Sequence, residues 1–426
     1  MQLAKVNKDR VFKNCWFAYF ATLLFWGIAY NVDNFTQIIK GRFIGDFVLW
    51  YSAAMLAKRA GSGPLNVYDL DLQYRNLIEL VRPLRCDQGT PVQYPPHFYA
   101  LVRPLANLSL HWAYAAWCLL ALPLIIIALF QLSKNFGKAH FSRAFFILAG
   151  LMSFPTCYAF SIGQTTIYQY PTLAAFWLLT RSNKFFSAGI VSALLTVKLQ
   201  YAPFVILIGL ILGRARFLLG LLTGGTVLAV FTVASIGLQN LIVYPKALLT
   251  METNEQGIAA PVMQNFRGEL MLFYVDVHLV HKIATGIFVV GIICVAFLWG
   301  IAYPKISKKA GEAAFALCLL LTTCIMLIFS PHTHFQDYMS VSIPVAFTYP
   351  LLKDIAPKDT KRRMLRLLLW GFPLFSWIPI FLIIPLVLLK IEPYFVWAIL
   401  VIGISISLCV DYIKGNVDKQ TLENTE

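Results

Sequence analysis

The residues that could do chemistry in this chain are few, and they lie at the ends of long apolar stretches. Lys198 is the most unusual of them, because it lies at an expected outer turn between two apolar stretches, where a lysine runs against the positive-inside trend. A bound phosphate would give its positive charge a partner. The alternative is that the side chain snorkels to the membrane interface.

A second polar group lies in a single turn. His332 and His334 alternate as metal ligands sometimes do, and Asp337 follows them. Such a triplet is weak evidence for a metal ion. We expect ordinary residues lining a site here, with no metal and no cofactor. The cysteines do not change this view, because Cys86 is the one cysteine in a long polar segment and has no partner there.

The elements that position these residues are expected to be membrane helices. The chain of 426 residues is 59% hydrophobic and 13% charged, so it cannot cover a soluble fold with charge. Apolar runs long enough to cross a bilayer recur from end to end. We predict an all-α polytopic membrane protein, a single domain over residues 1–426, with about 12 transmembrane helices. They lie near 14–32, 110–132, 143–161, 165–180, 184–198, 201–213, 217–237, 278–302, 312–329, 338–352, 365–389 and 393–411.

The charge distribution predicts an orientation. The formal net charge is +15, and most Lys and Arg residues fall in alternate loops, including 5–13 and 353–366. This is the positive-inside pattern, and it places both termini in the cytoplasm. We therefore predict a multi-pass protein of the plasma or inner membrane, and a nucleic-acid partner is not expected.

Two long segments interrupt the predicted spans on the outer side, at residues 33–109 and 239–277. In the first, apolar residues recur at helical spacing between 43 and 60, which predicts an amphipathic helix on the membrane surface. Asp46 stands at its start. A second helix is predicted over 69–81, with Asp69 able to cap it. Most other polar residues fall on the same side: Gln164, Lys198, Gln200, Asn265, Arg267, Glu269, His332, His334, Gln336 and Asp337.

Several short motifs in order resemble glycosyltransferase family 87, polytopic enzymes of the C-type superfamily. They are Gly45-Asp46-Phe47 with Tyr51, Val67-Tyr68-Asp69, Tyr94-Pro95-Pro96, Gly163-Gln164, Val197-Lys198-Leu199-Gln200, Asn265-Phe266-Arg267-Gly268 and Ser330-Pro331. The resemblance covers about residues 40–350. Relatives carry His residues five or six positions after the Ser-Pro, where this chain has Gln336 and Asp337.

The resemblance implies that a hexose, mannose-like, moves with inversion from a polyprenyl-phosphate donor to a lipid or glycan acceptor on the periplasmic or extracellular face. Asp46 would be the general base. A lipid phosphate is a reasonable leaving group, so no metal is required. The substrate-binding candidates are Arg42, Lys198, Gln200, Gln164, Arg267, Asn265, Tyr51, Tyr94, His97, His332, His334 and Asp337.

Other interpretations remain for the same residues. Asp46 and Asp69 could each cap a helix, Gln164 could bond a helix end, and Tyr94-Pro95-Pro96 could be a rigid turn. A secondary transporter or flippase is a rival function, although no internal repeat is present and the ionisable residues avoid the middle of the spans. A third possibility is a relative that binds lipid-linked sugars without catalysis.

Overall fold

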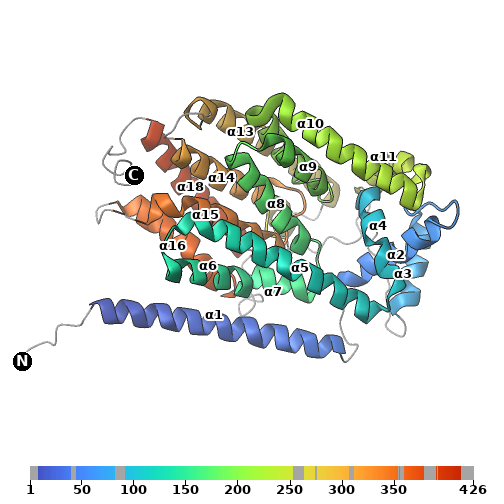
Figure 1. The fold of residues 1–426 in the computed structure, drawn as a ribbon, viewed down its shortest axis with the longest axis horizontal. Helices are drawn as coiled ribbons and strands as arrows, with labels where there is room; N and C mark the ends of the chain where they lie inside the picture. The colour runs from blue at the N-terminus through green and yellow to red at the C-terminus, as the bar shows by residue number, and fades with distance from the viewer. Residues whose placement is uncertain are drawn as a thin grey trace, which may run out of the picture.

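The computed structural model describes residues 8–39, 45–81, 92–252, 263–273, 276–306, 311–353, 355, 359–378, 390 and 392–413. Within these residues the protein is helical, and the β structure is limited to one isolated antiparallel bridge between Met263 and His334. Figure 1 shows an elongated bundle in which α1 runs along one side.

The α-helices, in chain order, are α1 (Lys8–Ile39), α2 (Phe47–Ala60), α3 (Leu70–Val81), α4 (Pro96–Val102), α5 (Leu110–Ser133), α6 (His140–Met152), α7 (Phe154–Ser161), α8 (Thr166–Arg181), α9 (Phe185–Leu195), α10 (Ala202–Ile236), α11 (Leu238–Glu252), α12 (Phe266–Phe273), α13 (Val277–Ile306), α14 (Glu312–Phe329), α15 (Ser342–Leu352), α16 (Thr360–Phe375) and α18 (Pro393–Ile413). Short 3-10 helices are η1 (Arg103–Asn107), η2 (Lys134–Phe136) and η4 (Phe335–Val341).

Five helices in the described residues are long and apolar enough to cross a membrane. They are Leu110–Phe136, Ala202–Ile236, Val277–Ile306, Glu312–Phe329 and Pro393–Asp411. A sixth crossing results if α6 and α7, which meet at a 42° bend, form one broken span. Large apolar side chains on these helices are exposed, for example Leu222 at 57% and Ile293 at 60%. Exposed apolar surface of this kind is what a lipid-facing helix presents.

The prediction of about twelve spans is therefore met in part. The predicted span 365–389 begins in α16, and its residues 379–389 lie outside the described residues. Three other predicted spans correspond to α8, α9 and α15, which are only 16, 11 and 11 residues long. At 1.5 Å per residue, such helices are shorter than the ~30 Å hydrocarbon core. Apolar content alone did not reveal this, because these helices are apolar wherever they pack against their neighbours.

Helix α10 contains a sharp break. Arg214 has φ 46° and ψ −129°, which is not a helical conformation. A Cβ atom on Gly209 would lie 2.3 Å from the ring of Phe217, a contact that a straight helix would not allow eight residues apart. The break falls between the predicted spans 201–213 and 217–237.

Segment 33–109 contains α2, α3 and α4, which cluster at one end of the bundle (Figure 1). At the other end, α1 begins and α18 ends. Asp69 caps α3 as expected, since the Leu72 amide donates to its Oδ1 at 2.9 Å. The face of α2 that the sequence assigned to the membrane surface is instead packed inside the protein, with Phe47 at 0% and Trp50 at 4% exposure. The pattern of apolar residues was correct, but it cannot distinguish a protein partner from lipid.

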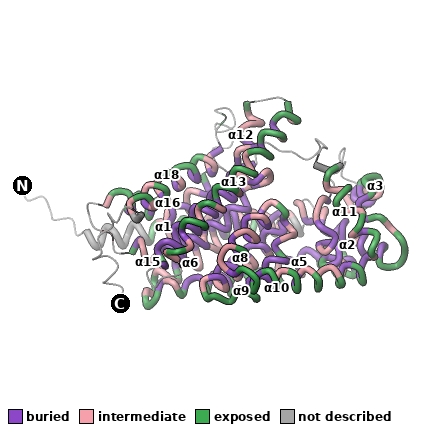
Figure 2. Tube along the Cα trace, turned by 90° about the horizontal axis from the view of Figure 1, so that it is seen from above, coloured by how far each residue is buried: buried purple, intermediate pink, exposed green. Residues whose placement is uncertain are grey.

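Buried and exposed residues separate clearly along the molecule. Figure 2 shows exposed residues along the outer sides of α5, α9 and α10, with buried residues between the layers of helices. Helix α14 is the most enclosed of the candidate spans, with 83% of its 18 residues buried. The turn that follows α14 carries His332, His334 and Asp337. Asp337 is buried there, and the two histidines are partly buried.

Candidate active site

Two glycines bring the start of α2 against the turn between α7 and α8. Gly45 and Gly163 have φ angles of 52° and 64°, a region that favours glycine. A Cβ atom on Gly45 would lie 2.5 Å from Ile162 Cα, and one on Gly163 would lie 2.6 Å from Phe47 Cβ. Because neither gap admits a side chain, glycine is required for this approach.

Hydrogen bonds then fix the contact. The Phe47 amide donates to Ile162 O at 2.9 Å. The indole nitrogens of Trp50 and Trp117 both donate to Gly163 O, at 2.9 and 3.0 Å. Two buried tryptophans thus hold one carbonyl, so the residue after it, Gln164, has a defined position beside α2.

Asp46 occupies the N-cap position of α2, but its side chain makes no capping hydrogen bond. Instead, Gln164 Nε2 donates to Asp46 Oδ2 at 2.7 Å. Burial raises the pKa of Asp46 above its ordinary value, while the Gln164 hydrogen bond and the charge of Lys198 lower it. The half-buried carboxylate therefore bonds Gln164 instead of capping α2, and burial increases its basicity.

Gln164 also connects Asp46 to the start of α8. Its Oε1 accepts from the Thr165 amide at 2.9 Å and from the Thr165 hydroxyl at 3.2 Å. The hydroxyls of Tyr94 and Thr165 are 3.0 Å apart. The side-chain amide is therefore oriented, with its oxygen toward Thr165 and its NH₂ toward Asp46.

The next residue leads to a second carboxylate. The Thr166 hydroxyl donates to Asp337 Oδ1 at 2.9 Å and accepts from Lys198 Nζ at 2.9 Å. Lys198 also forms a buried salt bridge with Asp337 Oδ1. Asp337 Oδ2 accepts from the His334 amide at 3.0 Å. Asp46 and Lys198 thus belong to two hydrogen-bonded groups that meet at consecutive residues, Thr165 and Thr166.

A buried arginine completes this end of the bundle. Arg267, 2% exposed, places Nη1 3.2 Å from His332 Nε2. Burial, followed by the charge of Arg267, holds the pKa of His332 well below its usual range. His332 is therefore neutral at pH 7 and can accept a hydrogen bond from the guanidinium.

Four of the predicted site residues make hydrogen bonds to other parts of the protein. The Tyr51 hydroxyl donates to Leu108 O at 2.7 Å, and Gln200 Nε2 donates to His332 O at 3.0 Å. Asn265 donates to Ser330 O and accepts from the Gly268 amide, which ties α12 to the turn after α14. His97 lies 3.3 Å from Thr196 Oγ1, and burial lowers its pKa to about 4.

The predicted set is thus divided. The structure joins Asp46, Gln164 and Tyr94 through Thr165, and it joins Lys198 and Asp337 at the adjacent Thr166. It also places Arg267 beside His332. Arg42 lies outside the described residues.

Sequence reasoning missed Thr165 and Thr166, which link the two carboxylates. The available signal was their position directly after Gly163-Gln164. Threonine is common as a capping residue at a helix start, so this pair did not indicate a functional role.

It also missed an acidic group near the same turn. Glu392 is 3% exposed and accepts from Gln264 Nε2, while its amide donates to Glu269 Oε1 at 2.9 Å. The backbone N–H of Gln264 donates to Thr333 O, and its backbone carbonyl accepts from the Tyr338 hydroxyl, both at 2.8 Å. Burial, and then the nearby Glu269 carboxylate, raise the pKa of Glu392 to about 9.

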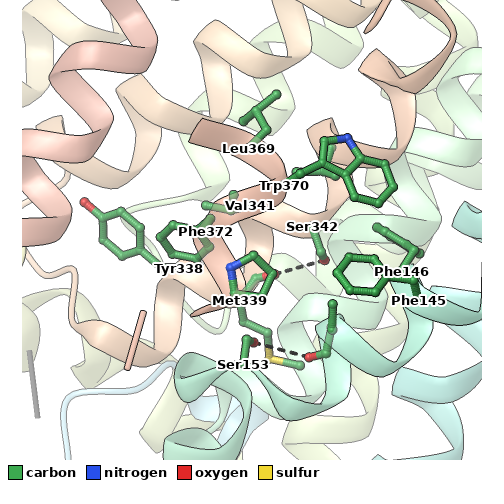
Figure 3. A pocket seen from close by; sticks show the side chains of 14 residues that line it. Phe145, Phe146, Ser153, Tyr338, Met339, Val341, Ser342, Leu369, Trp370 and Phe372 are labelled. Atoms are coloured by element: carbon green, nitrogen blue, oxygen red, sulfur yellow. Dashed lines mark hydrogen bonds between the residues drawn. The ribbon is translucent and has the colours of Figure 1, made fainter. Parts of the chain in front are cut away.

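A pocket lies behind η4, between α6, α15 and α16. Figure 3 shows Tyr338 and Met339 on one wall and Phe145, Phe146 and Trp370 on others. Its lining within the described chain is apolar apart from hydroxyl groups, with no carboxylate or cation. The described lining thus offers no group that could act as a base or hold a phosphate. No three metal-binding side chains come together within the described residues.

Comparison with known proteins now gives the family. A model of glycosyltransferase family 87 matches residues 93–331, more than half of the chain. The chain belongs to glycosyltransferase family 87. It is therefore a membrane glycosyltransferase by family, and the resemblance noted in its motifs is confirmed. No curated protein and no solved structure matches the chain.

The matched region of this family 87 protein contains Tyr94, Gln164, Lys198 and Arg267. Asp46 precedes the region and Asp337 follows it. Both carboxylates are nevertheless bonded directly to residues inside it, Asp46 to Gln164 and Asp337 to Lys198. The geometry thus connects the matched stretch to two groups that the match alone does not reach.

Proposed function

We propose that this family 87 protein transfers a hexose, mannose-like, from a polyprenyl-phosphate donor to a lipid or glycan acceptor. The reaction inverts the configuration at C1 of the sugar, and Asp46 is the general base. The observation that carries the proposal is the arrangement around Asp46. Its carboxylate does not cap α2, accepts a hydrogen bond from an oriented amide, and has a raised pKa.

In the proposed reaction, an acceptor hydroxyl donates its proton to Asp46 as its oxygen attacks C1 of the sugar. The bond between C1 and the phosphate oxygen breaks, and the polyprenyl phosphate leaves with that electron pair. A general base works best when its pKa lies near the working pH, so a raised pKa for Asp46 supports the role. Gln164 would keep the carboxylate aimed at the acceptor.

The leaving phosphate needs hydrogen-bond donors as its negative charge grows. We assign this role to Lys198 and Arg267. Lys198 Nζ donates to Thr166 and Asp337, and an ammonium group carries three N–H donors. Its third N–H has no partner in the described chain and would reach the phosphate. Arg267 would act from the opposite side with His332 as its neutral partner, and Arg42 stays a candidate for the same task.

The proposed face is periplasmic or extracellular. The basic loops predict that both termini are cytoplasmic, and α2–α4 lie at the end of the bundle away from the start of α1 and the end of α18 (Figure 1). Nucleotide sugars are made in the cytoplasm, so a site on the outer face favours a lipid-linked donor.

The proposal is tested with the protein purified into lipid nanodiscs. Polyprenyl-phosphate mannose, polyprenyl-phosphate glucose and GDP-mannose are each offered with a panel of lipid and glycan acceptors. We expect transfer from a lipid-linked donor, with inversion measured by NMR of the product. Transfer from GDP-mannose alone, or retention of configuration, would contradict the proposal, and empty nanodiscs are the control.

A further inference from the structure

Three buried polar groups near Asp337 lack hydrogen-bond partners in the described part of the chain. They are the Tyr201 hydroxyl, the Thr333 hydroxyl and the Gln336 side-chain carbonyl. Their residues are 6%, 0% and 2% exposed. Native proteins rarely leave buried polar groups unbonded, because desolvation is then uncompensated. Each such group therefore asks for an explanation.

The three groups come from two elements that meet. Tyr201 precedes α10, and Thr333 and Gln336 belong to the turn around η4. The Tyr201 ring lies beside the reactive network, with Lys198 Nζ 5.7 Å from the ring centroid. Its hydroxyl is close to Asp337 and Thr333. It makes no hydrogen bond of normal geometry with either of them.

Asp337 is already occupied, which limits what these groups can do for the fold. One carboxylate oxygen meets Lys198 and Thr166, and the other accepts from the His334 amide. The three unbonded groups offer two hydroxyls and one carbonyl, and the Tyr201 hydroxyl lies close to the neutralised ion pair. Neutral donors and acceptors of this kind suit sugar hydroxyls.

We propose that Tyr201, Thr333 and Gln336 bind hydroxyl groups of the sugar that is transferred. The inference rests on the proposed function and adds the subsite that selects the sugar. Gln164, which bonds Asp46, and Thr166, which bonds Asp337, are two residues apart, so a sugar held here would lie near the base. Because the three groups are enclosed, sugar binding also shifts the 330–334 turn or the Tyr201 side chain.

The test uses Tyr201→Phe and Thr333→Val, which remove only the unbonded hydroxyls. The matched controls are Tyr394→Phe and Thr348→Val, whose buried hydroxyls donate to Ser376 O and Pro344 O. Thermal unfolding is measured in nanodiscs without ligand, with polyprenyl phosphate and with polyprenyl-phosphate mannose. The difference in unfolding temperature between the two lipids reports the contribution of the sugar alone.

We expect Tyr201→Phe and Thr333→Val to unfold at the wild-type temperature or above it, because a costly unbonded group is gone. The extra stabilisation by the mannosyl lipid should be lost or reduced, and KM for that donor should rise about fivefold to tenfold. The controls should unfold at lower temperature and keep the wild-type KM.

Donors that lack a single sugar hydroxyl sharpen the test. If Tyr201 bonds one hydroxyl, wild type should lose about fivefold to tenfold in kcat/KM on that deoxy donor. Tyr201→Phe should then use the complete donor and that deoxy donor equally well. A merely structural role would give no such match between one side chain and one hydroxyl.

Two results would overturn the inference, and they differ. If wild type distinguishes the mannosyl lipid from polyprenyl phosphate and both hydroxyl variants do so equally, the groups bind water or nothing, and the proposed function stands. If wild type responds to neither lipid, the proposed donor is wrong and the subsite falls with it.

Discussion

Asp46 and Asp337 accept hydrogen bonds from neighbouring residues, Gln164 and Thr166, but have opposite surroundings. Asp337 is 2% exposed and has Lys198, Thr166 and the His334 amide around its two oxygens. Asp46 is half-buried and accepts a side-chain hydrogen bond from Gln164 at one oxygen. A carboxylate with a charged partner and full hydrogen bonding holds structure, whereas one with a raised pKa and room for another donor can take a proton.

Asp69 extends the comparison to a third carboxylate. Like Asp46 it stands immediately before a helix, but it bonds the Leu72 amide and caps α3. Position in the sequence therefore does not decide the role of an aspartate at a helix start. The hydrogen-bond partner decides it, and the predictions below test the assigned partners in order of expected effect.

Asp337→Asn should have the largest effect on stability. It leaves the buried Lys198 ammonium without its counter-charge, so the free energy of unfolding should fall by about 3–5 kcal/mol. Thermal unfolding of the purified variant in nanodiscs measures this. The double variant Lys198→Met with Asp337→Leu should recover much of the loss, because it removes both charges. If Asp337→Asn were as stable as wild type, Asp337 would not have the structural role assigned to it here.

Glu392→Gln tests a carboxylate that has no cationic partner in the described residues. Its pKa of about 9 is above the ordinary 4.5, so the folded state keeps a proton that the unfolded state releases. This contribution is complete below about pH 4.5 and is lost as the pH rises toward 9, by up to about 1.4 kcal/mol per pH unit. Wild type should therefore lose stability across that range, and Glu392→Gln should lose less.

The measurement is the unfolding temperature of both proteins from pH 5 to pH 9. The difference in favour of Glu392→Gln should grow with pH. A constant difference would mean that Glu392 is ionised in the folded protein at neutral pH.

Gln164→Leu tests the hydrogen bond that Asp46 accepts. This bond lowers the pKa of Asp46 against the effect of burial, so its loss should raise that pKa further. Since the base must be ionised, the acid side of the kcat/KM profile should move to higher pH, with about a tenfold loss at neutral pH. Gln73→Leu, which loses bonds to Val67 O and the Tyr99 hydroxyl, should leave the profile in place.

Asp69→Ala should have the smallest effect. Loss of the α3 cap should cost about 1 kcal/mol of stability and leave the rate of transfer unchanged. Unfolding temperature and transfer rate are measured on the same preparation. A large loss of transfer at preserved stability would show that Asp69 shares the function assigned to Asp46.

Local features of this protein could be predicted from the sequence. The α3 cap at Asp69, the helix near residues 47–60 and the apolar spans all depend on residues a few positions apart. The predicted site was harder, because Asp46 and Gln164 are 118 residues apart and Lys198 and Asp337 are 139 apart. One sequence contains no record of such pairings, so Lys198 was assigned to phosphate without its acidic partner.

Lengths and burial also escaped prediction. Hydropathy identified α9 and α15 as apolar but could not reveal that each has only 11 residues. Likewise, the apolar face of α2 was evident, while its packing inside the protein depends on Gly45 and Gly163, whose conformations cannot be read from composition.

The central claim is that Asp46 is the base of a glycosyltransferase, and Asp46→Asn tests it most directly. The initial rate of transfer from polyprenyl-phosphate mannose and the unfolding temperature are measured on the same nanodisc preparation, with Asp69→Asn as control. The account predicts a rate lowered by about 10²–10⁴-fold at an unfolding temperature equal to wild type or higher, because a buried charge has been removed. An undiminished rate in Asp46→Asn would contradict it.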